Sequence, residues 1–419
     1  MKKATLLLGM IICIMGVLYL KDADADTVLI KTDADSIPME QPIADTKEMT
    51  LKETEEETVS ATENEEMSET VTEDEVILTQ REGSSLVFFG LSMEEQKVYT
   101  EILTALTELD TDTRLSSCDQ AQIDKVFQCV MLDHPEIFYV DGYKYTWYKE
   151  GDKIIKIEFT GNYLYSAEEI EDRKKQIESA VSDILAGVPD TEDEYLIVKY
   201  IYETLVSDTE YDSEGADNQN ICSVFIHGRS VCQGYAKAFQ YLLHRMGMEA
   251  GLVKGEVKDG GSHSWNLVSV NGNWYYADVT WGDASYRLSE GAEIKNKTVN
   301  RDGFVNYDYL CVTSEQLLKT HMIQMPVPVP ECSTMTDNYY VREGLYFTEY
   351  DAEKIGDLFE KAAMIKSNAV TIKCSDDAVF ERMYQELIEN QTVFSYITTE
   401  DGAIAYTDNK VQGSITFWL

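Results

Sequence analysis

The chain has 419 residues, 44% of them hydrophobic, and its 35 Lys and Arg against 76 Asp and Glu give a formal net charge of −41. This length predicts two or three domains, and the apolar fraction is sufficient for buried cores. The acidic balance argues against binding to nucleic-acid phosphates or to an anionic membrane surface, because both require clustered cations.

The first 25 residues are typical of a targeting segment. Two lysines precede a nearly unbroken apolar run from Ala4 to Leu20. The run is short for a membrane-spanning helix and fits the core of a signal peptide, with Ala23-Asp24-Ala25 as a small-x-small cleavage site. Because that site has acidic surroundings, an uncleaved membrane anchor is the alternative. We therefore expect residues 1–25 to be a signal peptide or an N-terminal membrane anchor, and the protein to be secreted or held at the cell surface.

The stretch 26–85 is rich in Asp, Glu and Thr and contains no aromatic residue. Such a composition cannot bury enough apolar surface to offset the entropy that a chain loses on folding, so it predicts an acidic disordered linker. The linker is interpreted either as a spacer that lifts a catalytic part off the cell surface or as a solvated connection without a sequence-specific role.

Residues 86–190 are predicted to form an N-terminal α+β region, with a hairpin turn at Glu150-Gly151-Asp152. The expected helices are Met93–Leu109, Gln120–Leu132 and Ala167–Leu185, and the expected strands are Ile137–Val140, Tyr143–Tyr148 and Ile154–Phe159. The next region is expected to begin with a helix at Glu192–Val206, capped by Asp190 or Thr191.

The chain contains eight cysteines, and an exported protein can use some of them in disulfides, although sequence alone does not give the pairing. Cys118 and Cys129 are predicted to share one helix, where a rise of about 1.5 Å per residue separates them by roughly 16 Å. That separation exceeds the reach of a disulfide, so this pair is excluded.

Residues 191–325 contain the segments that carry candidate chemistry. In the first, Cys232 to Met246, apolar residues recur at helical spacing, with Ser230 as the predicted N-cap and Gly247 as the stop. Cys232 therefore lies at the start of a helix, where the helix dipole and the free backbone N–H groups favour a thiolate and can stabilise an oxyanion. The alternative is a buried structural cysteine.

The second and third segments form a predicted hairpin. A two-residue turn signal, Asn271-Gly272, separates two alternating stretches, Leu267–Val270 and Trp274–Ala277. Pairing across this turn places His263 opposite Thr280 and diagonal to Asp278 on the same face, with the Cβ atoms of His263 and Asp278 roughly 7 Å apart. A His–Asp hydrogen bond is within reach at that separation. Taken singly, the two residues are also explained as a satisfied histidine and a solvated aspartate.

After the proline-rich stretch 326–330, residues 333–419 predict a small C-terminal α+β domain without internal repeats or a catalytic motif. Its expected helices are Asp351–Ile365 and Asp377–Glu389, and its expected strands are Tyr339–Phe347, Val370–Lys373, Phe394–Thr398, Ile404–Thr407 and Ser414–Trp418.

Together, Cys232, His263 and Asp278 predict a nucleophilic triad. The cysteine attacks an amide carbonyl as a thiolate, and the histidine takes the thiol proton and later gives it to the leaving amine. The aspartate fixes the imidazole tautomer and stabilises its charged form. An amine then resolves the resulting thioester in cross-linking, or water resolves it in deamidation or proteolysis.

The sequence around these positions resembles the transglutaminase-like superfamily in its bacterial secreted form. The resemblance rests on Val-Cys-x-Gly-Tyr-Ala at 231–236, His-x-Trp-Asn at 263–266 and Trp-Tyr-x-x-Asp-x-Thr-Trp at 274–281. It implies an α+β fold with a papain-like transglutaminase core, in which the helix that carries the cysteine packs on an antiparallel sheet. It also implies Cys232 as nucleophile, His263 as base and Asp278 as the third member, without a cofactor.

Four residues are weaker candidates for substrate binding. Trp265 and Trp281 are candidates to line the acyl site, with core packing as the alternative. Gln233 or Tyr211 is a candidate to stabilise the oxyanion. Gln233 also marks a departure, because the animal enzymes have Trp after the nucleophile, and no acidic loop has calcium-site spacing, so calcium-dependent cross-linking is not expected.

The remaining histidines considered, His227, His244 and His321, are expected to be structural or surface residues. A zinc site made from the triad itself would lack a second Cys or His at ligand spacing, so no metal is predicted.

These observations predict an extracellular enzyme that uses cysteine for acyl transfer or hydrolysis at peptide or protein amide bonds. The expected partner is a protein or peptide substrate, with a cell-wall peptide as one candidate, and no nucleic acid. Contact with a membrane is expected only through the N-terminal segment. The alternatives are an inert cell-surface module that binds a peptide in the same cleft, and a structural envelope protein whose terminal domains mediate association.

Overall fold

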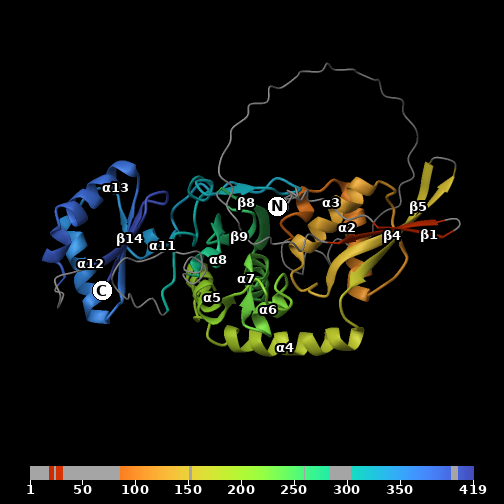
Figure 1. Ribbon diagram of the computed structural model, residues 1–419, viewed down its shortest axis with the longest axis horizontal. Coiled ribbons are helices and arrows are strands. Elements are labelled where there is room, and N and C mark those ends of the chain that lie inside the picture. Colours follow the sequence, from red (N-terminus) through yellow and green to blue (C-terminus); the bar gives the residue numbers. More distant parts are fainter. Residues whose placement is uncertain are drawn as a thin grey trace, which may run out of the picture.

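The computed structural model describes residues 18–22, 25–31, 85–150, 153–258, 260–283, 303–397 and 404–419. Three regions follow one another along the longest axis of the molecule (Figure 1), coloured orange to yellow, green to teal, and blue. Residues 1–17 and 23–24 of the predicted leader (1–25), and residues 32–84 of the predicted linker (26–85), lie outside the described residues.

The N-terminal region is a sheet covered by two helices. The strand order in the sheet is β1-β2-β4-β5-β3. Its long antiparallel pair consists of β4 (Val140–Glu150) and β5 (Lys153–Tyr163), with the short β3 (Thr113–Arg114) at one edge. The helices are α2 (Met93–Glu108), which begins with a capping box at Ser92, and α3 (Gln120–Asp133), which Asp119 caps.

Two parts of this sheet differ from the sequence-based expectation. Residues 26–31, expected to start the disordered linker, form β2 (Ala25–Lys31), which pairs with β4, and β1 (Leu18–Asp22) pairs with β2. The physical reason is the short apolar run Val28-Leu29-Ile30, which composition averaged over the whole acidic stretch conceals. The expected strand Ile137–Val140 is largely a turn, and β4 begins only at Val140.

The central region packs helices on one antiparallel sheet of order β10-β9-β8-β11. Its strands are β8 (Ala250–Val257), β9 (Ser262–Val270), β10 (Asn273–Ala277) and β11 (His321–Ile323). Its helices are α4 (Ala167–Leu185), α5 (Glu194–Asp208), α6 (Ile221–Phe225), α7 (Cys232–Arg245) and the short α8 (Val279–Gly282). Asp193 caps α5, in place of the expected Asp190 or Thr191.

The Asn271-Gly272 turn sets the register of the central hairpin. Both residues have positive φ, 49° and 80°, as a two-residue hairpin turn requires. The strands consequently pair Asn273 with Val270 and Trp274 with Ser269, as the sequence predicts. This register brings His263 and Asp278 to the same end of the sheet.

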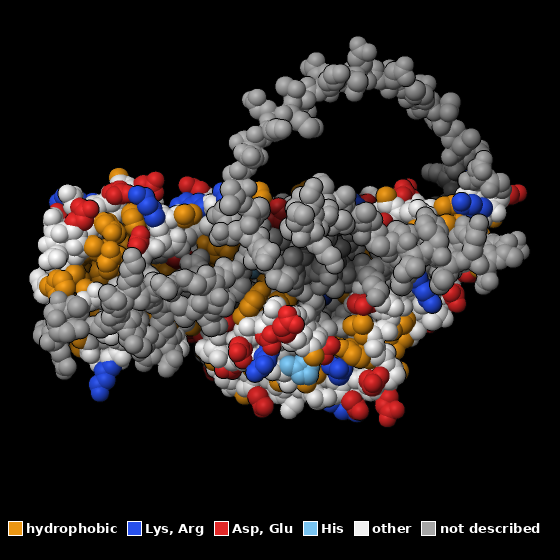
Figure 2. All heavy atoms as spheres, viewed as in Figure 1, with side chains coloured by type: hydrophobic (Ala, Val, Ile, Leu, Met, Phe, Trp, Pro, Cys, Tyr) orange, Lys and Arg blue, Asp and Glu red, His pale blue; other side chains and the backbone are white. Residues whose placement is uncertain are grey.

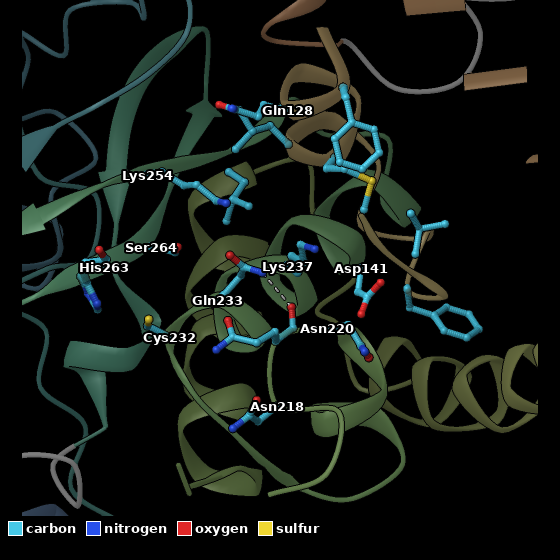
Figure 3. A pocket seen from close by; sticks show the side chains of 18 of the residues that line it. Gln128, Asp141, Asn218, Asn220, Cys232, Gln233, Lys237, Lys254, His263 and Ser264 are labelled. Atoms are coloured by element: carbon cyan, nitrogen blue, oxygen red, sulfur yellow. Dashed lines mark hydrogen bonds between the residues drawn. The ribbon is translucent and has the colours of Figure 1, made fainter. Parts of the chain in front are cut away.

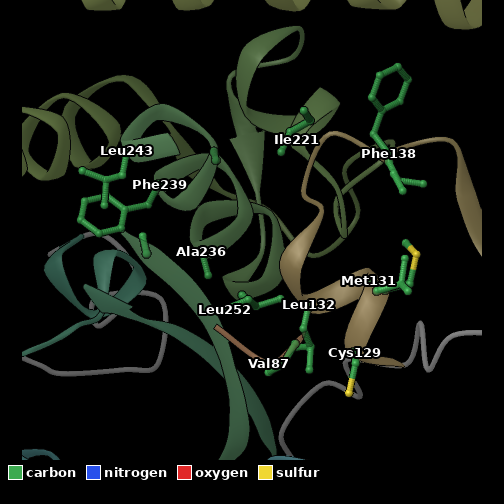
Figure 4. Packing of buried hydrophobic residues seen from close by; sticks show 14 of the residues in the cluster. Val87, Cys129, Met131, Leu132, Phe138, Ile221, Ala236, Phe239, Leu243 and Leu252 are labelled. Atoms are coloured by element: carbon green, nitrogen blue, oxygen red, sulfur yellow. The ribbon is translucent and has the colours of Figure 1, made fainter. Parts of the chain in front are cut away.

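One hydrophobic core joins the N-terminal and central regions. Leu132 and its neighbours on α3 belong to the same buried cluster as Phe239 and Leu243 on α7 and Leu252 on β8 (Figure 4). Within it, the side-chain amide of Gln240 donates to the carbonyl of Leu132 at 3.0 Å. The helix that carries Cys232 is therefore held from one side by α3 and from the other by the sheet.

The C-terminal region has a core and a sheet of its own, of order β12-β13-β15-β14. The strands are β12 (Tyr346–Phe347), β13 (Ala369–Cys374), β14 (Ala405–Asn409) and β15 (Ser414–Trp418), and the main helices are α12 (Ala352–Ile365) and α13 (Asp377–Tyr384). Lys373 and Ser414 both bond to the buried Asp308, which ties this sheet to the central region.

Two strands expected in this region are wrong. Tyr339–Arg342, the start of the first, forms α11, because Asn338 caps the segment and Gly344, with φ +74°, ends it in a turn before β12. Thr392–Ser395, at the start of the second, is a turn of 3-10 helix. At Tyr339–Arg342, local capping and turn chemistry thus override β-prone aromatic residues, whereas no side chain caps Thr392–Ser395.

Acidic side chains are spread over the face of the molecule shown in Figure 2, and hydrophobic side chains gather at its left, over the C-terminal region. The cysteines in the described ranges, Cys118 and Cys129 among them, are all free thiols. None of the helices described is both long and apolar enough to cross a membrane.

Candidate active site

The N-terminus of α7 presents Cys232 without a side-chain cap. The N-cap residue is Val231, in extended conformation, rather than the predicted Ser230. The Ser230 hydroxyl is instead buried under the first turn, 2.7 Å from the Ser223 hydroxyl, where Gly234 leaves room for it. Because no side chain occupies the helix start, its first backbone N–H groups remain available to a ligand beside Cys232.

Asp278 lies where β10 ends and α8 begins. The last strand pair is Ala277 with Asn266, and the chain then turns into α8, so the predicted opposition of Thr280 and His263 is wrong. Asp278 caps α8, its Oδ1 accepting from the backbone N–H of Trp281 at 3.1 Å. Its Oδ2 is thereby directed to the sheet and accepts from Nε2 of His263 at 2.8 Å.

This hydrogen bond fixes the orientation of the His263 imidazole. An ionised carboxylate only accepts, so Nε2 donates and Nδ1 is left for the thiol of Cys232. Burial lowers the pKa of His263, but the charge and hydrogen bond of Asp278, followed by those of Cys232, raise that pKa to about 10. Burial raises the pKa of Asp278, and the charges and hydrogen bonds of His263 and His321 reverse this and hold it well below its usual range. At neutral pH the pair is therefore an imidazolium and a carboxylate.

A second histidine, His321, contacts the same carboxylate oxygen. It lies on β11, opposite Val257 of β8, and is fully buried. Its Nε2 donates to Oδ2 of Asp278 at 3.2 Å, and its Nδ1 lies 2.8 Å from the hydroxyl of Thr320. His321 is expected from sequence to be a structural or surface residue. It is buried, and it bonds to the carboxylate of the predicted triad.

The other two histidines considered from sequence, His227 and His244, do not bond to His263, Asp278 or His321. His227 is near the surface and bonds to Asp217, and His244 bonds to the backbone carbonyl of Ala250 at 2.8 Å. No motif surrounds His321 in the sequence, and a three-residue strand far downstream gives no register signal, so only the sheet order β10-β9-β8-β11 reveals its position.

Replacing His321 by Phe is expected to lower the turnover number roughly 10- to 100-fold, because one hydrogen bond to a charged group contributes about 1.5–3 kcal/mol. His321→Gln retains a donor and should recover part of the loss. Steady-state kinetics, with thermal unfolding measured in parallel, checks this. Equal activity of the Phe variant and the wild type, or no advantage of Gln over Phe, would show that His321 does not position Asp278.

The same three groups also form a donor set that zinc accepts. One ligand atom each from His263, Asp278 and His321 lie within 4.8 Å of one another. Nε2 of each histidine lies at hydrogen-bond distance from Oδ2 of Asp278, so one proton on each Nε2 explains the short distances. A metal ion bound here would have to displace both protons. The zinc set considered from sequence used Cys232, and the structure puts His321 in its place.

Cys232 and His263 lie at the wall of a cavity of ≈ 460 Å³. Figure 3 shows side chains entering it from α7, β8 and β9, and from α3 of the N-terminal region. Gln233 lines this cavity next to Cys232, and its side-chain amide also donates to the carbonyl of Gln219 at 3.1 Å. One N–H of the Gln233 amide is therefore already engaged, and its role at an oxyanion stays a prediction.

The other three candidates for substrate binding are not among the residues that line the cavity. Trp265 is fully buried, and its ring centre lies 5.9 Å from that of His263. The half-buried Trp281 packs on both imidazoles, 5.8 Å from His263 and 4.7 Å from His321. Tyr211 pairs with Ser230 between the short strands β6 (Glu210–Tyr211) and β7 (Arg229–Ser230). The two tryptophans follow the core-packing alternative.

The model of the transglutaminase-like superfamily matches residues 182–279, a span that includes Cys232, His263 and Asp278. The chain carries a transglutaminase-like domain. The predicted α+β fold with a transglutaminase-like core is thereby confirmed. The matched span ends before His321, which the transglutaminase-like domain of this chain receives from a later segment.

Solved structures similar to this chain include three from different proteins. A crystal structure of a TGase has 17% identity and a TM-score of 0.25, over 35% of this chain and 44% of its own. A protein from Cytophaga hutchinsonii, described as a candidate cysteine protease, has 14% identity and a TM-score of 0.23, over 34% and 58%. The periplasmic domain of TgpA from Pseudomonas aeruginosa has 13% identity and a TM-score of 0.23, over 36% and 73%.

The chain thus spans 44% of the first of these proteins and 58% of the second. No curated protein matches the sequence.

Proposed function

We propose that this protein performs cysteine-dependent acyl transfer or hydrolysis at peptide or protein amide bonds through a thioester intermediate. One observation carries the proposal: an uncapped helix start presents Cys232, and an imidazole fixed by a 2.8 Å hydrogen bond to Asp278 lies at the wall of the same cavity. A buried structural cysteine needs neither the oriented imidazole nor the open space.

The first half-reaction forms the thioester. In the resting ion pair Nδ1 of His263 already holds the proton of Cys232, and the thiolate sulfur attacks the amide carbonyl carbon to give a tetrahedral oxyanion. The backbone N–H groups at the start of α7, with the side-chain amide of Gln233 nearby, are placed to stabilise that oxyanion. As the C–N bond breaks, the imidazolium returns its proton to the leaving amine.

The second half-reaction reverses these roles. His263 takes a proton from an amine or a water molecule, which attacks the thioester carbonyl and releases Cys232. An amine gives a cross-linked product, and water gives a deamidated or cleaved one. Asp278 accepts the hydrogen bond from Nε2 of His263 throughout and stabilises the imidazolium in both halves.

The proposed location is outside the cytoplasm, on the basis of the apolar N-terminal segment, with that segment as the only contact with a membrane. The proposed partner is a protein or peptide substrate, and a peptide of the cell wall fits an exported enzyme of this chemistry. The net charge of −41 favours neither nucleic acid nor an anionic lipid surface.

The pH dependence of iodoacetamide labelling tests the proposal. We expect Cys232 to label about tenfold faster at pH 7 than Cys118, which is less buried, because the His263 imidazolium and the helix start both favour a negative charge on the sulfur of Cys232. Peptide mapping identifies the labelled cysteine, and His263→Ala should remove the difference. A chelator in the buffer should leave it unchanged, whereas metal held by His263, Asp278 and His321 would make it chelator-dependent.

The rate of acyl transfer and the rate of Cys232 labelling should depend differently on pH above neutrality. The pKa of His263 is raised to about 10, so the imidazolium that protonates the leaving amine is present below that pH and is lost as the pH rises through it. Acyl transfer should therefore decline near pH 10 while labelling of the thiolate does not. If Cys232 labels no faster than Cys118 at any pH, the inert peptide-binding alternative takes precedence.

A further inference from the structure

The wall of the active-site cavity contains a buried lysine that the proposed reaction does not use. Lys237 lies on α7, five positions after Cys232, and is 6% exposed although it lines the cavity. No hydrogen bond or ion pair joins its ammonium group to another residue in the described part of the chain. A largely buried charge without a protein partner costs free energy, and an anion bound in the cavity would offset that cost.

The negative charges of the cavity are engaged elsewhere. Asp124 accepts from the hydroxyl of Tyr143, and Asp141 accepts from the side-chain amide of Asn162. Asp217 pairs with the guanidinium of Arg173 at 2.9 Å. Each of these acids thus has a hydrogen-bond or ion-pair partner within the protein, whereas the ammonium group of Lys237 has none among the described residues.

A second cation, Lys254 on β8, lines the same cavity. Figure 3 shows the side chains of Lys237 and Lys254 extending into it from two different elements. Burial and then the charge of Lys254 lower the pKa of Lys237 to about 7, and the charge of Glu136 opposes this. Glu136 is itself hydrogen-bonded to His134 at 2.7 Å. An anion bound between the two ammonium groups would relieve their repulsion and the desolvation of Lys237.

We propose that Lys237 and Lys254 bind a carboxylate of the substrate, so that the enzyme prefers acidic peptides. This proposal rests on the proposed function, because the carboxylate belongs to the peptide that Cys232 is proposed to attack. The cavity and its two lysines are observed independently of that function. Five helical positions correspond to about 7.5 Å along α7. An extended peptide covers this distance in about two residues, so the carboxylate is expected within one or two residues of the amide that reacts with Cys232.

The test measures how fast Cys232 of the full chain is alkylated by bromoacetyl amino acids. The probes are bromoacetyl-glycine, bromoacetyl-aminobutyrate and bromoacetyl-aminohexanoate, each compared at pH 6 with its uncharged methylamide. The acid should react about tenfold faster than its amide at the chain length that reaches Lys237, as expected for a charge-assisted hydrogen bond. The ratio of acid to amide is measurable whether Cys232 reacts quickly or slowly.

Lys237→Met is the matched variant, because it keeps the length of the side chain and removes its charge. The ratio should fall to about one, while labelling by iodoacetamide stays as fast as in the wild type. Lys254→Met should lower the ratio in part, and it provides the measurement should the first variant fail to fold.

Two results would overturn the carboxylate subsite. One is equal labelling by acids and amides in the wild type at every chain length, and the other is a preference for acids that survives Lys237→Met. Neither affects the proposed function, which fails instead when Cys232 shows no enhanced reactivity toward neutral iodoacetamide. The two proposals therefore fail on different measurements.

Discussion

Asp278→Asn is expected to lower the turnover number by about 10⁴, the loss known for the same change in a serine protease triad. The amide can present its NH₂ to Nε2 of His263, which then has to accept, and the proton moves to Nδ1, where it blocks uptake of the thiol proton. His321 loses its charged acceptor in the same step. Acyl-transfer kinetics and iodoacetamide labelling of Cys232 both report this loss.

The control for this variant is another buried aspartate outside the cavity. Asp337 is 1% exposed and bonds to Asn271, Tyr275 and Arg342, so Asp337→Asn removes a comparable set of hydrogen bonds. It should lower the stability of the fold while leaving the labelling rate of Cys232 unchanged. An Asp278→Asn protein that folds and keeps its rate within about tenfold of the wild type would contradict the triad.

Gly255→Ala is expected to destabilise the fold by about 3 kcal/mol, the upper range for overpacking, because the new methyl group has no direction in which to move. A Cβ at this position would lie 1.9 Å from the carbonyl oxygen of Met322 on β11 and 2.7 Å from the ring of Trp265. Relief requires β11 to shift, and β11 carries His321. Urea unfolding and the labelling rate of Cys232 measure the two consequences.

Gly261→Ala is the matched control, because a Cβ there has no neighbour within 4 Å. It should unfold at nearly the same urea concentration as the wild type. If Gly255→Ala unfolds there as well, the close approach of β8 and β11 is not a constraint on the fold.

The elements that the sequence predicts correctly are those specified by local signals. The α7 helix follows from apolar spacing, and the register of β9 and β10 follows from Asn271-Gly272, whose positive φ angles force one pairing. That register alone brings His263 within reach of Asp278. The prediction that Ser230 caps α7 is wrong. Its hydroxyl bonds to the hydroxyl of Ser223 instead of a backbone N–H of the helix, and sequence alone does not show which of these two partners it takes.

The parts that sequence does not predict depend on contacts between distant segments. His321 reaches Asp278 only because β11 adds to the outer edge of β8, and three residues are too few for a periodic pattern. Lys237 is one lysine within an amphipathic helix, and its burial follows from α3 closing the opposite wall of the cavity. The C-terminal segment at Tyr339–Arg342 has β-prone residues, but the cap at Asn338 makes it helical.

The core shared by α3 and α7 bears on where this protein can be divided. The span recognisable as a family, 182–279, contains the triad but neither Leu132 and its neighbours nor the strand that holds His321. A fragment of residues 182–279 alone would expose the apolar face of α7 and would lack the cavity wall formed by α3. The span matched by the family model is therefore smaller than the unit that folds around the cavity, and the N-terminal region supplies part of the cavity wall.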